Sequence, residues 1–103
     1  MTIDWRELMN KTEEKYIIEV YFEDVGETFY VGKDPFSSHK YVLVRDPMNA
    51  IKYTYNSAKS AIIQYDYSTE WRDTSGTVIL TGDIFNRPGY DVKIKKMTIQ
   101  YTW

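Results

Sequence analysis

The residues of this chain that could carry out chemistry are few, and their spacing does not suit catalysis. Cysteine is absent, and the single histidine, His39, lies beside two serines in "FSSHK". A nucleophilic triad needs a base and an orienting acid placed around the nucleophile, and neighbours within one loop do not form that geometry. Zinc lacks ligands for the same reason. The sequence therefore predicts a non-enzymatic protein with no metal and no cofactor.

A group of carboxylates in "YDYSTEWRD" is the best candidate for a cation bound through oxygen atoms. Asp66 and Glu70 fall one helical turn apart, and Asp73 follows them. Their spacing fits no known calcium-binding loop, and Arg72 lies among the acids. We therefore expect no metal site in this segment.

Aromatic residues among polar ones are the clearest functional signal. A run of tyrosines and one tryptophan lies between residues 53 and 72. Tyr, Trp and Arg dominate protein interfaces because they combine a large contact area with a polar group. The residues that we expect to bind a partner are Tyr67, Trp71 and Arg72, with the neighbouring acids Asp66 and Glu70. The alternative is that these aromatic side chains form an ordinary core.

The charge of the chain argues against nucleic acid as the partner. The formal net charge is −2, and residues 1–34 carry nine acids against four bases. Single-stranded nucleic acid stacks on aromatic side chains but also needs a positively charged groove. The acids around the aromatic segment would repel phosphates, so we expect a protein partner, or a basic surface on one.

The elements that position these residues follow from periodicity and turn signals. Asp4 as N-cap and Glu7 in the capping-box position predict a short N-terminal helix that ends near Lys15. Alternating or apolar runs predict strands at "YIIEVYFE", "TFYVGKD", "KYVLVRD", "TVILTGDIF" and "YDVKIKKMTIQYTW". The first two form a hairpin around "DVGE".

The middle segment, "NSAKSAIIQY", can be read in two ways. Asn56 or Ser57 can cap a helix. The apolar face of that helix would consist of Ala58, Ala61, Ile62 and Tyr65. A strand is the alternative, but we favour the helix because the segment is rich in Ala and Ser rather than in branched residues.

The last strand changes phase in its middle. Val92 and Ile94 have one parity, and the apolar residues after Lys96 have the other. A β-bulge at Lys95 and Lys96 would place all of them on one face. We therefore expect a bulged strand that belongs to the core.

These elements predict one domain over residues 1–103 with an α+β fold. Its antiparallel sheet has about five strands, with an N-terminal helix and a second helix in the middle. A small, mostly β barrel is the alternative. No apolar run approaches the ~20 residues of a membrane helix, and the first fifteen residues are too acidic for a signal peptide. We therefore expect a cytoplasmic protein, whose oligomeric state the sequence leaves open.

Two segments, "YVLVRDPMNAIKYTYNSAKSAIIQY" and "KIKKMTIQYTW", resemble small accessory proteins encoded by phages and mobile elements of Gram-positive bacteria. The resemblance implies a protein that binds and blocks or modulates a host or phage protein, such as a component of a defence system. The alternatives are a module that binds or sequesters a nucleotide or oligonucleotide, and a structural subunit of a phage particle.

Overall fold

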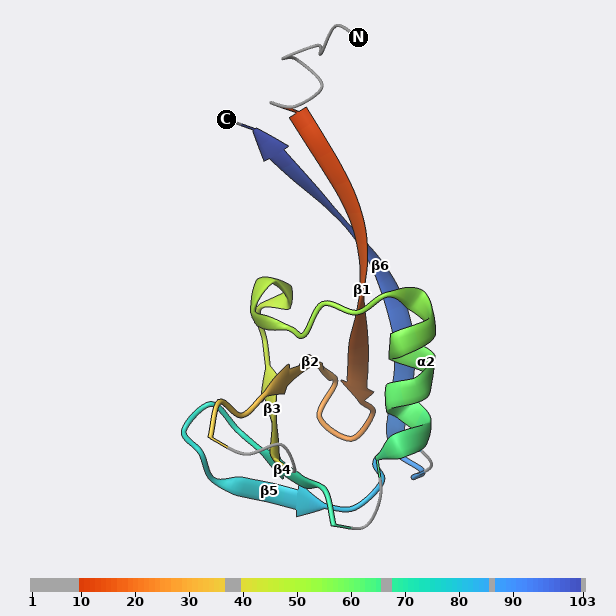
Figure 1. Ribbon diagram of the computed structural model, residues 1–103. Coiled ribbons are helices and arrows are strands. Elements are labelled where there is room, and N and C mark those ends of the chain that lie inside the picture. The colour runs from red at the N-terminus through yellow and green to blue at the C-terminus, as the bar shows by residue number, and fades with distance from the viewer. Residues whose placement is uncertain (1–9, 37–39, 66–67, 86, 103) are drawn as a thin grey trace, which may run out of the picture.

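The computed structural model describes residues 10–36, 40–65, 68–85 and 87–102, and its strands form one sheet (Figure 1). The elements are β1 (Asn10–Phe22), β2 (Glu27–Lys33), β3 (Lys40–Val44), the 3-10 helix η1 (Pro47–Asn49), α2 (Tyr55–Gln64), β4 (Glu70–Arg72), β5 (Val78–Thr81) and β6 (Tyr90–Thr102). The strand order is β5-β4-β3-β2-β1-β6.

The predicted fold is wrong in its sheet and in its helices. The sheet has six strands and is mixed, because β4 runs parallel to β3. Within the described ranges α2 is the one α-helix, accompanied by the short η1. The alternative, a small and mostly β barrel, agrees better with the number of strands. The described strands nevertheless form an open sheet whose edges are β5 and β6.

β1 and β6 form a long antiparallel ribbon. They pair continuously from Asn10 and Thr102 at one end to Phe22 and Tyr90 at the other. The first half of this ribbon projects away from the rest of the sheet (Figure 1). Residues 10–15 are therefore strand, where the capping signals predicted helix. The residues that would begin that helix, 1–9, lie outside the described ranges.

The predicted bulge in β6 is also wrong. The register between β1 and β6 continues without a shift past Lys95 and Lys96. Val92 and Ile94 pack against the core, so Met97 lies on the opposite face of the ribbon because side chains alternate along a strand. Pairing over 13 residues in each strand outweighs the gain from placing every apolar residue on one side.

The predicted hairpin between β1 and β2 is confirmed. The register pairs Phe22 with Glu27 at its closed end. Gly26 has a φ of +68° and donates its N–H to the Phe22 carbonyl over 2.8 Å. Glycine suits this turn because it adopts positive φ without steric cost.

The chain passes from β3 to β4 through η1 and α2, which gives the parallel pair. Parallel neighbours need a long crossover, and a helix usually supplies it. η1 packs closely on β2, because a Cβ at Gly32 would lie 3.3 Å from the Val42 carbonyl and 3.4 Å from that of Asn49. None of the described helices is long and apolar enough to cross a membrane.

Helix α2 forms where the pattern in the middle segment predicted it. Its N-cap is Thr54, whose side-chain oxygen accepts the N–H of Ser57 over 3.1 Å. The expected caps, Asn56 and Ser57, lie inside the helix. Ala58 is fully buried against the sheet, so the helix docks through its small residues.

The core lies between α2 and one face of the sheet. Its buried members are Ile18, Val20, Val31, Leu43, Ala58, Tyr65, Trp71 and Ile84. Each fully buried large aliphatic or aromatic side chain contributes ~1.5–3 kcal/mol through removal from water. This single cluster joins α2 to strands β1 to β4 and fixes the helix beside the sheet.

Candidate functional site

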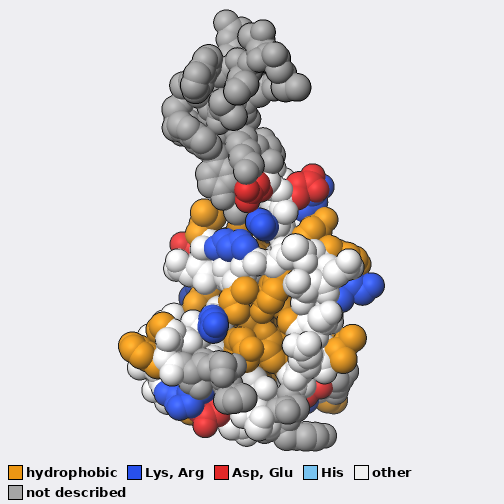
Figure 2. Space-filling view, in the orientation of Figure 1, with side chains coloured by type: hydrophobic (Ala, Val, Ile, Leu, Met, Phe, Trp, Pro, Cys, Tyr) orange, Lys and Arg blue, Asp and Glu red, His pale blue; other side chains and the backbone are white. Residues whose placement is uncertain are grey.

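A cavity of about 630 Å³ opens between α2 and the starts of β3 and β4. It is lined by Tyr41, Tyr53, Asn56, Ser57, Ser60, Ala61, Gln64, Tyr65, Ser68 and Thr69, and we call it the tyrosine groove. Figure 2 shows its hydrophobic floor in orange, beside the largely white polar surface of α2. Among the described lining residues none is charged.

Helix α2 forms the polar wall of the groove through a row of polar side chains along one of its faces. Ser57, Ser60 and Gln64 follow one another at spacings of three and four residues, so they share one face of α2. This stripe lies next to the buried stripe that contains Ala58. The packing of α2 on the sheet therefore turns hydroxyl and amide groups toward the cavity.

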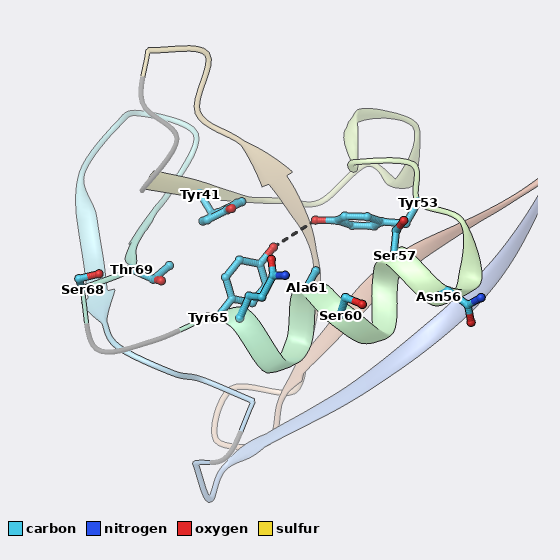
Figure 3. A pocket seen from close by; sticks show the side chains of 10 residues that line it. Tyr41, Tyr53, Asn56, Ser57, Ser60, Ala61, Tyr65, Ser68 and Thr69 are labelled. Atoms are coloured by element: carbon cyan, nitrogen blue, oxygen red, sulfur yellow. Dashed lines mark hydrogen bonds between the residues drawn. The ribbon is translucent and has the colours of Figure 1, made fainter.

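Three tyrosines form the floor and the opposite wall. Figure 3 shows Tyr41 and Tyr53 on either side of Tyr65, which ends α2. The hydroxyls of Tyr53 and Tyr65 are hydrogen-bonded at 3.1 Å. The backbone of Tyr53 is held by two hydrogen bonds to Tyr16 of β1. Each residue donates its N–H to the carbonyl of the other over 2.8 Å. The phenols are therefore held in place before any ligand arrives.

Burial changes the acidity of two of these phenols. Removal from water raises the pKa of Tyr65 far above its ordinary value, and its bond to Tyr53 adds to the effect. Burial also raises the pKa of Tyr53, although the bond to Tyr65 opposes the rise. Burial therefore opposes the ionisation of both phenols.

Trp71 supports the groove from beneath. Its ring lies 5.5 Å from that of Tyr41 and 5.1 Å from that of Tyr65, and Phe85 closes the cluster at 5.6 Å. The indole N–H donates to the Gly82 carbonyl over 2.8 Å. Such aromatic pairs add ~0.5–1.5 kcal/mol beyond their buried area. The tyrosine floor therefore rests on an aromatic layer that is itself anchored.

The expectation that Trp71 is an exposed anchor is wrong, since the side chain is 0% exposed. Its strand, β4, lies between β3 and β5, and the rings of Tyr41, Tyr65 and Phe85 pack around the indole. Asp66 and Tyr67 lie outside the described residues, as does His39. Their predicted roles stay predictions.

Arg72 and Glu70 belong to an ion network within the chain. Arg72 donates to the Glu70 carboxylate over 3.0 Å and to the Gly76 carbonyl over 2.9 Å. Its Nε lies 3.9 Å from the Asp34 carboxylate, and Lys40 lies 3.8 Å from Glu70. These contacts tie β4 to β3 and to the turn after it. The role of both residues in partner binding stays a prediction.

The sequence pattern identified part of the groove and missed the rest. Tyr53 and Tyr65 belong to the aromatic run that was singled out, but Tyr41 comes from a separate strand. The polar stripe of α2 went unnoticed, although Ser57, Ser60 and Gln64 stand at helical spacing beside the apolar stripe. That spacing was the available signal.

The groove can stack apolar or aromatic groups on tyrosine and exchange hydrogen bonds with hydroxyls and amides. In the part of the chain that the structure describes, no three His, Cys, Asp or Glu side chains gather as a metal site. Comparisons with known protein families, with curated proteins and with solved structures found no match. The tyrosine groove is therefore the feature of this protein that bears on its function.

Proposed function

We propose that this protein is a non-enzymatic binding module whose tyrosine groove receives a neutral segment of a protein partner. The observation that carries the proposal is the lining, which combines three fixed tyrosines with serine, asparagine and glutamine. Antibody binding sites use the same chemistry: rigid Tyr rings give contact area at low entropic cost, and small polar residues adapt their hydrogen bonds. A volume of about 630 Å³ is within the range of ligand pockets.

The lack of charge among the described lining residues favours a protein segment over an oligonucleotide. A nucleic-acid ligand needs Lys or Arg to neutralise its phosphates, and its affinity falls steeply with salt. In the setting that the sequence resemblance suggests, the partner would be a host protein in the cytoplasm. The module would then block or modulate it by occupying one of its exposed segments.

The test is a selection of random short peptides against the immobilised protein and two variants. Ser60→Trp fills the groove from its helical wall. Ile63→Trp adds the same ring at the neighbouring turn of α2, at a side chain that is 85% exposed and does not line the groove. We expect neutral peptides to be enriched on the native protein and on Ile63→Trp, and lost on Ser60→Trp at an unchanged melting temperature.

Salt and lysate experiments complete this test. A neutral ligand should keep its affinity within about twofold between 50 and 200 mM salt, whereas 6–10 phosphate contacts would cost about 10³–10⁵. A host protein captured from nuclease-treated lysate should disappear with Ser60→Trp and remain with Ile63→Trp. Equal capture by both variants would show that the groove is not the binding site.

A further inference from the structure

A second cavity, of about 640 Å³, lies at the other end of the core face of the sheet. Strand β3 connects the two: Tyr41 near its start lines the tyrosine groove, and Leu43 near its end lines the second cavity. The apolar lining consists of Phe22, Val25, Phe29, Leu43, Val44 and Ile79. We call it the apolar cavity. It collects the ends of β1 and β3 and the starts of β2 and β5.

The mouth of the apolar cavity keeps apolar groups in contact with water. Val25 is 63% exposed and Ile79 is 43% exposed, and they come from the turn between β1 and β2 and from β5. Below them the rings of Phe22 and Phe29 pack at 4.9 Å between centroids. An apolar side chain that entered here would cover these groups, which gives a favourable contribution roughly proportional to the area removed from water.

The rim of the apolar cavity is acidic. Its charged residues are Glu27, Asp46 and Asp73, against one cation, Arg45. Arg45 pairs with Glu27 at 3.0 Å and lies 5.2 Å from the centroid of the Phe29 ring. The protein's own guanidinium thus shows that a cation is accommodated between the rim and the aromatic floor.

The two remaining carboxylates are fixed by their turns. Asp46 accepts the N–H of Met48 over 2.9 Å. Asp73 accepts the N–H groups of Ser75 and Thr77 at 2.9 and 3.0 Å. The hydroxyl of Ser75 is the main cause that lowers the pKa of Asp73, so this carboxylate carries its charge throughout the neutral range. An incoming cation would meet negative charges that are already in position.

We propose that the apolar cavity binds a peptide segment of a protein partner in which Lys or Arg residues flank one large apolar side chain. The apolar side chain would enter between Val25 and Ile79, and the basic residues would meet the acidic rim. This proposal does not rest on the tyrosine groove, whose described lining is uncharged. An anionic lipid surface or a nucleic acid would meet the rim with charge of the same sign.

Peptide titration of the intact protein, followed by the backbone amide signals in NMR spectra, tests the proposal. The probe is acetyl-Lys-Lys-Phe-Lys-Lys-amide, and the comparison peptides replace Phe by Ser or every Lys by Glu. The probe should bind and shift the signals of Val25, Phe29 and Ile79. The Ser peptide should bind at least tenfold more weakly, and the Glu peptide should not bind at these residues.

Variants of the protein separate the rim from general attraction between opposite charges. The double change Glu27→Gln with Asp46→Asn keeps the shape of both side chains, and Asn retains the oxygen that accepts the Met48 N–H. It should weaken the probe about tenfold or more, whereas Asp91→Asn, which lies on the other face of the sheet and does not line the cavity, should leave it unchanged. Arg45→Gln should strengthen binding, because it removes the competing cation.

Several results would overturn the proposal. If Asp91→Asn weakened the probe as much as the double change, the effect would be general attraction between opposite charges. If the Ser peptide bound as tightly as the probe, the large apolar side chain would not contribute to binding. Shifts confined to Tyr41 and Tyr65 would assign the basic peptide to the tyrosine groove. Binding of anionic vesicles or of an oligonucleotide at Val25 and Ile79 would contradict the assigned charge of the partner.

Discussion

The hydroxyl oxygens of Tyr53 and Tyr65 lie 3.1 Å apart, and their bond joins the segment before α2 to the residue that ends the helix. The segments on either side of α2 are therefore linked across the tyrosine groove. Because both phenols are shielded from water, the bond is formed between neutral groups in a partly buried environment. It couples the shape of the groove to the stability of the fold.

Alkaline pH should destabilise the protein through these two phenols. Tyrosine ionises near pH ~10 in an unfolded chain. The raised pKa values mean that the folded state keeps protons that the unfolded state releases. This contribution is therefore fully present below pH ~10 and is lost as the pH rises above it. Melting temperatures should fall less steeply with pH in Tyr65→Phe than in the native protein; parallel curves would contradict the coupling.

Replacement of Trp71 by alanine should destabilise the fold severely. The ring is fully buried among Tyr41, Tyr65 and Phe85, and its loss leaves a large void and an unpaired Gly82 carbonyl. We expect a cost of ~3–5 kcal/mol in the free energy of unfolding, measured by urea denaturation. Trp71→Phe should cost less because it retains a ring. A melting temperature within a few degrees of the native value for Trp71→Ala would show that the side chain is not in the core.

The cap of α2 gives a prediction that distinguishes the observed helix start from the expected one. Thr54→Ala should cost ~0.5–2 kcal/mol, because the N–H of Ser57 loses its side-chain acceptor. Thr54→Ser should preserve most of the stability. Asn56→Ala, at an expected cap that lies within the helix, serves as the control and should have little effect. The reverse order of the two alanine variants would place the start of the helix two residues later.

Gly32→Ala should destabilise the packing of β2 against β3 and η1. The added methyl group would meet the Val42 carbonyl and a Val44 methyl at 3.3 Å, which is closer than ordinary contact. Overpacking of this kind costs ~1–3 kcal/mol. Thermal unfolding measures the loss, and amide shifts in Pro47–Asn49 would locate it. An unchanged melting temperature would mean that β3 and η1 shift without cost to admit the methyl group.

Local signals in the sequence predicted the elements whose partners are near in the chain. The hairpin closed by Gly26 and the helix docked through Ala58 depend on turn chemistry and on spacing within one segment. Residues 10–15 depend instead on pairing with residues 97–102, which lie 82 to 92 positions later along the chain. That pairing leaves no local pattern in the sequence. The capping pattern around Asp4 and Glu7 therefore predicted a helix whose last part, residues 10–15, belongs to β1.

The parallel pair was within reach of the sequence, since a helix between two strands is the usual crossover of parallel neighbours. The burial of Trp71 could not be predicted from the sequence. Residue type alone does not distinguish an interface ring from a core ring. The short strand around Trp71 gave no sign that Tyr41, Tyr65 and Phe85 would pack around its ring. The aromatic run marked the correct region, and the tertiary fold selected Tyr53 and Tyr65 from it.

The ribbon of β1 and β6 also sets how the molecule responds to a pulling force. A load applied between Asn10 and Thr102 acts on a paired position at the tip of the ribbon. Backbone hydrogen bonds lie across antiparallel strands, so such a load breaks them one after another rather than together. Resistance should rise when the opening front reaches Tyr16, whose backbone is bonded to Tyr53, and then Ile18 and Ile94, whose side chains join the core. Tension on the two ends of the ribbon would therefore unzip it as far as Tyr16 while both cavities keep their shape.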